Sequence, residues 1–161
     1  VSFGREVGAT FIVENYVNNM VGSIEQVERL FSQINMPNLK LICDPTNYFT
    51  RENVGDGDAL LREIFRVLSD KMVIAHAKDI LRTEDTGEKH ANIDADDSHS
   101  FRGAGGIALP AAGLGELNYP LYVQLLGQNH PNIPLIIEHL DEGDIKRAKA
   151  FVDGVLKKQG V

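Results

Sequence analysis

The sequence predicts an α/β protein built on a parallel sheet, and two observations carry this prediction. Four short apolar runs have the length and continuity of strands buried on both faces: residues 9–15, 39–45, 71–79 and 133–140. A helical pattern follows each of them, so the order is strand then helix, four times. Repeated units of this kind require parallel strands covered by helices, in a barrel or in an open doubly wound sheet.

The helices are predicted from capping signals and apolar stripes. Ser23 followed by Gln26 has the spacing of a capping box, and Asp58 is a suitable cap for the second helix. Pro120 suits the first turn of the third helix, and Asp144 opens the fourth. In the first two helices apolar residues at helical spacing occupy one side and charged residues the other, which is typical of surface helices.

The composition indicates one globular domain over residues 1–161 and restricts its partners. The net charge is −7 and the pI is near 5.2. No basic face is available for a phosphate backbone, so we expect no nucleic-acid partner and favour a small-molecule substrate. Cys43 is the single cysteine, which fits a reducing compartment, and no apolar run has the length of a membrane helix. We therefore expect a cytoplasmic protein with no membrane contact.

The length of the chain limits the architecture. A (β/α)₈ barrel needs about 250 residues, so this chain supplies only about half of one. It begins with Val1 rather than Met, and the first strand pattern starts almost at once, which suggests a piece of something larger. Four parallel strands leave two unpaired edges and an exposed apolar face. We therefore expect either a homo-oligomer in which two copies meet or a protein whose N-terminal half is missing.

Each predicted strand ends on a residue that can bind a metal ion: Glu14, Asp44, His76 and Glu138. The carboxyl ends of parallel strands form the functional face of such folds. A carboxylate buried beside an apolar strand costs several kcal/mol unless it is paired or ligated, so a shared cation is a natural explanation. Three carboxylates and one imidazole favour Mn, Mg or Co, and catalytic Zn stays open. The alternative is that each group simply pairs with a Lys, an Arg or backbone N–H groups.

Four segments in this order, FIVENY, CDPTN, VIAHAKD and LIIEH, resemble the xylose isomerase-like TIM barrel superfamily, and specifically its sugar phosphate isomerase/epimerase members. The segment GLGELNYPLYVQLL is similar to the Gly-x-Gly stretch that precedes the seventh helix of that family. The resemblance covers nearly the whole chain. It implies strands five to eight, the C-terminal half of the barrel.

The resemblance also implies a function. Glu14, Asp44, His76 and Glu138 would be the metal ligands, and Glu14 and Glu138 would also be the catalytic proton carriers on opposite sides of the substrate carbon. The expected activity is that of a metal-dependent isomerase or epimerase of a small sugar, sugar acid or sugar phosphate, through an enediolate intermediate.

Two further positions are candidate substrate-binding residues. Asn47 stands where many relatives have a His, so it can donate a hydrogen bond to a substrate hydroxyl but cannot titrate. Arg82 stands where some epimerases carry an Arg that contacts substrate, although a solvated surface Arg is an equal alternative. Met20 departs from the second Glu of free-ketohexose epimerases. Lys78 and Asp79 are expected to form salt bridges with each other or with neighbouring strand-end groups.

Other interpretations stay open. A dehydratase that resembles those of inosose would use the same ligands, and a half-barrel fragment could be non-catalytic. The DNA-repair endonucleases of the superfamily are disfavoured by the acidic charge. We interpret Gly103, Gly105 and Gly106 as a flexible lid rather than a phosphate loop, and Cys43 as a buried structural thiol. The remaining histidines are expected to face solvent or to point away from the site: His90, His99, His130 and His139.

Overall fold

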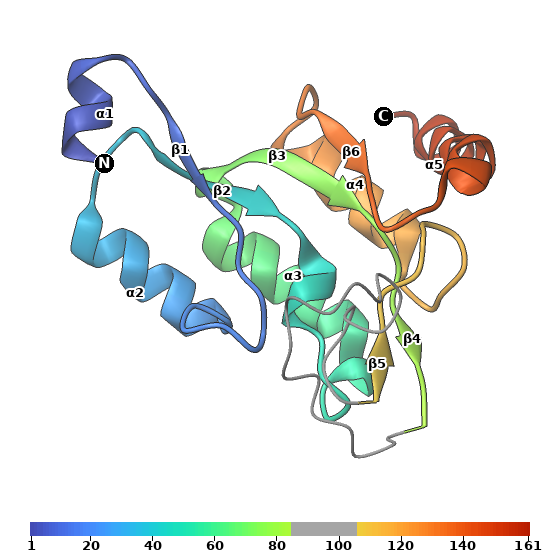
Figure 1. Ribbon diagram of the computed structural model, residues 1–161. Coiled ribbons are helices and arrows are strands. Elements are labelled where there is room, and N and C mark those ends of the chain that lie inside the picture. Colours follow the sequence, from blue (N-terminus) through green and yellow to red (C-terminus); the bar gives the residue numbers. More distant parts are fainter. Residues whose placement is uncertain (85–105) are drawn as a thin grey trace.

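The computed structural model describes residues 1–84 and 106–161 (Figure 1). Its helices and strands, in chain order, are α1 (Ser2–Glu6), β1 (Phe11–Val13), α2 (Ile24–Ile34), β2 (Leu39–Cys43), α3 (Gly57–Leu68), β3 (Met72–Ala77), β4 (Leu81–Arg82), β5 (Ile107–Ala108), α4 (Tyr119–Asn129), β6 (Leu135–Ile137) and α5 (Ile145–Gln159). None of the helices in these two ranges is long and apolar enough to cross a membrane.

The four predicted strands form one parallel sheet in the order β1-β2-β3-β6, which confirms the α/β prediction. Phe11 of β1 pairs with Leu39 of β2, and Cys43 of β2 pairs with Ala75 of β3. Ala75 in turn pairs with Leu135 of β6. Since side chains that are paired in a parallel sheet point to the same face, this register fixes which residues share a face.

The helix signals act mostly as expected. The predicted capping box forms, with the amide of Gln26 donating to the Ser23 hydroxyl and the side chain of Gln26 accepting from the Ser23 amide. The prediction for Asp58 was wrong, because α3 begins one residue earlier, at Gly57, and Asp58 lies in its first turn. Asp58 instead accepts two hydrogen bonds from the side-chain amide of Asn118, the cap residue of α4.

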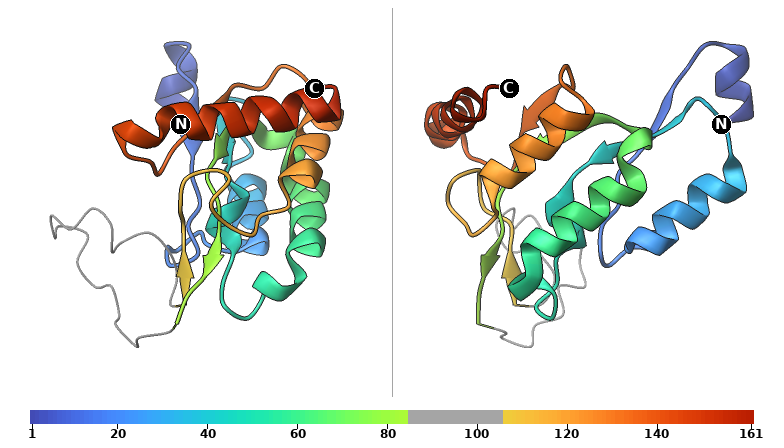
Figure 2. Two further views of the ribbon diagram at one scale, coloured as in Figure 1. Left: turned by 90° about the vertical axis from the view of Figure 1, so that its right-hand side faces the viewer. Right: turned by 180° about the vertical axis from the view of Figure 1, so that it is seen from behind.

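Helices α2, α3 and α4 cover one face of the sheet (Figure 2). The residues of β2 that point to this face, Leu39, Leu41 and Cys43, are at most 4% exposed. Leu61, Ile64, Phe65 and Leu68 of α3 and Tyr119, Tyr122, Val123 and Leu126 of α4 are also buried in this core. The core therefore lies between the sheet and its helices, and the burial of Cys43 confirms the structural reading of this thiol.

The opposite face of the sheet is apolar and partly exposed. By register it carries one isoleucine from each strand, the open-face isoleucines Ile12, Ile42, Ile74 and Ile136. Ile12 is 38% exposed and Ile136 is 47% exposed, while the central two are half-buried. The prediction that all four strands are buried on both faces was therefore wrong for β1 and β6. These are edge strands whose open side has no neighbour within the described parts of the chain.

The segment after β3 contains a short element that the sequence patterns did not indicate. Strands β4 and β5 form an antiparallel pair, with Leu81 opposite Ala108 and Arg82 opposite Ile107. Between them, Gly103 and Gly105 of the expected lid lie outside the described residues, as do His90 and His99. Gly106 is described and adopts a positive φ of 76° just before β5.

Candidate metal centre

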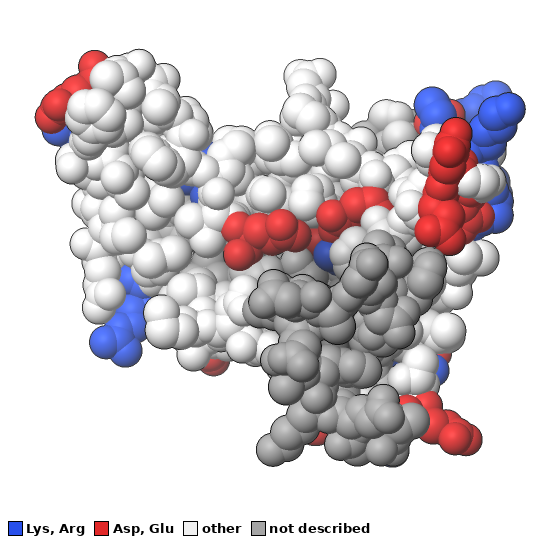
Figure 3. All heavy atoms as spheres, viewed as in Figure 1, with Lys and Arg blue, Asp and Glu red and all other residues white. Residues whose placement is uncertain are grey.

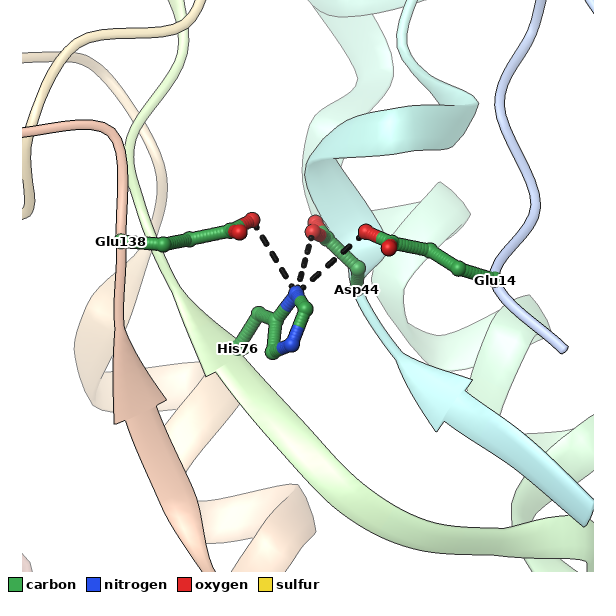
Figure 4. Close-up of side chains that lie close together, drawn as sticks. All are labelled: Glu14, Asp44, His76 and Glu138. Carbon is green, nitrogen blue, oxygen red and sulfur yellow. Dashed lines mark hydrogen bonds and ion pairs between the residues drawn. The ribbon is translucent and has the colours of Figure 1, made fainter. Parts of the chain in front are cut away.

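The strand ends bring the four predicted ligands together. Glu14, Asp44 and Glu138 directly follow β1, β2 and β6, and His76 is the penultimate residue of β3. Cys43 and Ala75 are paired, so the next position on each strand places Asp44 beside His76 on the open face. Figure 4 shows Glu14 and Glu138 reaching toward the His76 ring from opposite sides, with Asp44 between them.

The ring nitrogen Nδ1 of His76 is the meeting point of the cluster. It lies 3.3 Å from Glu14 Oε1, 3.2 Å from Asp44 Oδ2 and 3.0 Å from Glu138 Oε1. A single N–H cannot form three well-directed hydrogen bonds, so this packing is not explained by ordinary pairing. Four potential ligand atoms, one from each residue, lie within 4.8 Å of one another. Ligands about 2.1 Å from an octahedral Mg²⁺ lie about 3 to 4.2 Å apart, so modest adjustment would accommodate a divalent ion.

Lys78 is the second cation of the cluster, and it is 2% exposed. Its ammonium group lies 2.7 Å from Asp44 Oδ2 and 2.7 Å from Glu138 Oε1. The expected salt bridge is therefore present, and its partners are two of the candidate ligands rather than Asp79. A buried ammonium with two carboxylate partners offsets much of its own desolvation cost and restricts both carboxylates.

The pKa values within the cluster follow from these contacts. Burial alone would lower the pKa of His76, but hydrogen bonds to Asp44, Glu138 and Glu14 raise it to about 11. Burial would raise the pKa of Asp44, but contacts with His76 and Lys78 hold it well below its usual range, and the pKa of Glu138 is lowered by the same two partners. Without a metal, a protonated imidazole and the Lys78 ammonium therefore share the three carboxylates.

Two uncharged side chains also donate hydrogen bonds to carboxylates of the cluster. The Thr46 hydroxyl donates to Asp44 Oδ1 at 2.7 Å, and the side-chain amide of Asn47 donates to Glu14 Oε1 at 3.1 Å. Asn47, predicted to bind substrate, is buried and contacts a candidate ligand instead of standing free in a pocket. Thr46 was not singled out from the sequence, although its place two residues after Asp44 is a common spacing for a local hydroxyl–carboxylate bond.

Arg82 is not placed in the cluster. Its guanidinium group donates to Glu116 Oε2 at 3.0 Å and 2.8 Å, and the side chain is 58% exposed. It lies in a pocket of about 250 Å³ whose lining includes Asp58 and Asn118 and none of the four cluster residues. A role of Arg82 in substrate binding stays a prediction.

Asp79 and the described histidines have other partners. The Asp79 carboxylate accepts from the backbone amides of Ile80, Gly113 and Leu117, each at 2.9 Å, and so anchors the loop before α4. His130 was expected to face solvent, but it is half-buried with Nε2 2.7 Å from the Ser69 carbonyl oxygen. His139 points away from the cluster, with Nδ1 3.1 Å from the Leu109 carbonyl oxygen.

Solved structures with the same fold were found, whereas no protein-family model matches the sequence and no curated protein is significantly similar to it. A xylose isomerase domain protein from Planctomyces limnophilus is similar over 99% of this chain, with a TM-score of 0.68 and 21% identity. A xylose isomerase-like TIM barrel protein from Mycobacterium smegmatis, solved in complex with magnesium, matches with a TM-score of 0.64 and 15% identity over 97% of the chain. The probable 3-DHS dehydratase AsbF of Bacillus anthracis, involved in petrobactin synthesis, matches with a TM-score of 0.64 and 14% identity over 94%.

The match extends over nearly all of this chain but only over part of each solved structure. The shares of those three chains that are covered are 49%, 45% and 51%. The chain thus spans about half the length of the proteins it matches, and its parallel strands correspond to a partial barrel. The protein therefore has the fold of a xylose isomerase-like TIM barrel, of which this chain supplies about half.

Proposed function

We propose that Glu14, Asp44, His76 and Glu138 bind one divalent metal ion in an enzyme that isomerises or epimerises a small carbohydrate. The observation that carries this proposal is the convergence of three carboxylates on one imidazole nitrogen at the ends of four parallel strands. Lys78 and a protonated His76 leave one of the three carboxylate charges uncompensated, and the oxygen-rich chemistry of the set suits Mg²⁺, Mn²⁺ or Co²⁺, with Zn²⁺ as an alternative. The magnesium in the Mycobacterium smegmatis protein supports this assignment.

The two glutamates are the proposed proton carriers. Glu14 and Glu138 approach the cluster from opposite sides (Figure 4), and the side chain of Glu14 is 39% exposed. One carboxylate would take the proton from a carbon next to a carbonyl group, giving an enediolate, and return of a proton would complete the isomerisation or epimerisation. A divalent ion bound there would supply stabilisation for the negative charge on the substrate oxygens.

The surface charges around the cluster favour an uncharged substrate. Figure 3 shows a small acidic patch near the middle of the open face, with mostly uncharged surface directly above it. Lys78 is engaged by carboxylates and Arg82 by Glu116. We therefore propose a small uncharged sugar as the substrate class, ahead of a sugar acid or sugar phosphate, with hydrogen bonds from Asn47 and Arg82 as further proposed contacts.

Metal binding is the first test, because this chain contains all four proposed ligands. Elemental analysis after gel filtration should find about one equivalent of Mn²⁺, Co²⁺, Mg²⁺ or Zn²⁺, and chelator should remove it. The variant with Glu14→Gln and Glu138→Gln should lose the metal, while Glu116→Gln is a matched control outside the cluster. Wild-type protein that retains no metal after reconstitution would contradict the proposal.

A lyase is the second candidate function, and the probable dehydratase among the similar structures favours it. Loss of a hydroxyl group beside the enediolate would release water, whereas isomerisation conserves mass. Incubation of candidate sugars in D₂O with metal-loaded protein separates the two by mass spectrometry. Deuterium incorporation without loss of water supports the isomerase, and a product lighter by one water supports the dehydratase.

The proposed function requires that the open-face isoleucines are covered in the complete protein. A non-catalytic half-barrel is the alternative if nothing covers them, because half of the substrate pocket would then be absent. We propose that further βα units, from the same polypeptide or from a second copy, pack against Ile12, Ile42, Ile74 and Ile136. Light scattering on purified chain should show a dimer or larger species, and a stable monomer would exclude pairing of two copies.

A further inference from the structure

We infer that Tyr122 is a positioning residue that fixes the distance between the two strand ends carrying Asp44 and His76. Its hydroxyl group donates one proton, shared between the carbonyl oxygen of His76 at 2.8 Å and that of Cys43, the residue before Asp44, at 3.3 Å. One buried side chain of α4 thus contacts the main chain at two neighbouring candidate ligands. The functional consequence of this inference rests on the proposed metal site, whereas the bridge itself does not.

The sheet does not provide this connection. The pairing of β2 with β3 ends at Cys43 and Ala75, one position before the cluster. The amide of Asp44 donates to the Ile42 carbonyl oxygen of its own strand at 3.2 Å, so β2 turns away from the ladder there. Tyr122 contacts the two chains at this point from the helix side of the sheet. Removal of its hydroxyl group would leave the separation of Asp44 and His76 to the strand pairing one residue earlier and to their side-chain contacts.

The position of Tyr122 is rigid. Its side chain is 0% exposed, and its ring makes edge contacts with Phe65 of α3 and Tyr119 of α4 at centroid distances of 6.2 Å and 6.1 Å. Packing against both helices keeps the ring, and therefore its hydroxyl group, in place. The position of these helices on the sheet then fixes the position of the two strand ends. Groups that hydrogen-bond to metal ligands commonly alter metal affinity about 10- to 100-fold, and we expect a group that positions the main chain of two ligands to act at the lower end of this range.

Tyr119 provides a matched control on the same helix. It is 1% exposed, and its hydroxyl group donates to the Lys78 carbonyl oxygen at 2.8 Å. It contacts one main-chain carbonyl group rather than two, and Lys78 is not among the proposed ligands. Tyr119→Phe and Tyr122→Phe each remove one buried hydroxyl group and keep the ring, so they should lower the free energy of unfolding by similar amounts.

The experiment compares wild type, Tyr122→Phe and Tyr119→Phe by titration with Mn²⁺ and by the electron paramagnetic resonance spectrum of the bound ion. Tyr122→Phe should weaken Mn²⁺ binding at least about tenfold and change the spectrum, while Tyr119→Phe should stay within about twofold of wild type. Equal affinities in wild type and Tyr122→Phe, or equal losses in both variants, would overturn the inference.

A second measurement on metal-free protein keeps the two proposals separable. The carbonyl groups of Cys43 and His76 belong to the peptide units of Asp44 and Ala77, so Tyr122→Phe should shift the amide NMR signals of both residues. Tyr119→Phe should instead shift the signal of Asp79. If wild type binds no metal, the metal proposal fails, and these signals still decide the bridge: a shift confined to Ala77 would show that Tyr122 does not connect the strands.

Discussion

Metal binding should release a proton from His76, and this can be measured directly. The three carboxylates hold the pKa of His76 at about 11, so its imidazole is protonated throughout the neutral range in metal-free protein. A metal ion needs the deprotonated Nδ1, the atom on which the carboxylates converge. Since the pKa lies well above neutrality, the apparent affinity should rise about tenfold per pH unit between about pH 6 and pH 9, with about one proton released per ion.

Isothermal titration of Mn²⁺ in two buffers of different ionisation enthalpy measures the proton release, and repetition at several pH values gives the slope. A histidine with its ordinary pKa of 6.5 would give an affinity that levels off above about pH 7. His130→Asn is the control, because His130 lies outside the cluster and its loss should leave the proton count unchanged. A plateau above neutral pH, with no proton released, would refute the reasoning about His76.

Three further predictions concern stability. In the presence of chelator, the pKa of His76 in the folded protein is higher than its unfolded value of 6.5, so its stabilising contribution is full below about pH 6.5 and is lost as the pH rises toward about 11. Thermal unfolding should therefore show a melting temperature that falls over this pH interval, and that falls less in His76→Asn. Lys78→Met should lower the free energy of unfolding of metal-free protein by about 3 kcal/mol in urea, because two carboxylates lose their buried partner. Added Mn²⁺ should stabilise this variant more than it stabilises wild type, and an equal stabilisation of both would argue against the role of Lys78. Gly115→Ala should lower the free energy of unfolding by about 1 to 3 kcal/mol, because the added Cβ would collide with the Ile80 carbonyl oxygen. In the control Gly143→Ala the added Cβ meets no atom within 4 Å, so this variant should unfold at nearly the wild-type urea concentration.

The strand ends were predictable because the signal is local. An apolar run that stops at Glu14 or His76 marks both a strand and its carboxyl end, and parallel βα order then brings such ends to one edge of the sheet. The capping box at Ser23 has the same local character. Burial was less predictable, since the exposure of Ile12 and Ile136 depends on which neighbours lie across the barrel axis and not on the strands themselves.

Partners distant in sequence account for most of what the sequence did not indicate. The position of Arg82 is set by Glu116, which lies 34 residues further along the chain. Tyr122 has the same apolar helical spacing as any core residue, and nothing in that pattern distinguishes a hydroxyl group that contacts two strands. Such roles arise only when β2, β3 and α4 are assembled.

The charges of the cluster explain why a divalent ion fits better than an ion of another charge. With His76 neutral, three carboxylates and the ammonium group of Lys78 leave two negative charges in a small, partly buried volume. A divalent ion cancels both, a monovalent ion leaves one uncompensated, and a trivalent ion adds an excess positive charge. In metal-free protein the proton on His76 cancels only one of the two, so the exchange of that proton for a divalent ion removes the remaining charge. Lys78, which is not among the proposed ligands, thus sets the charge that a bound metal ion would balance.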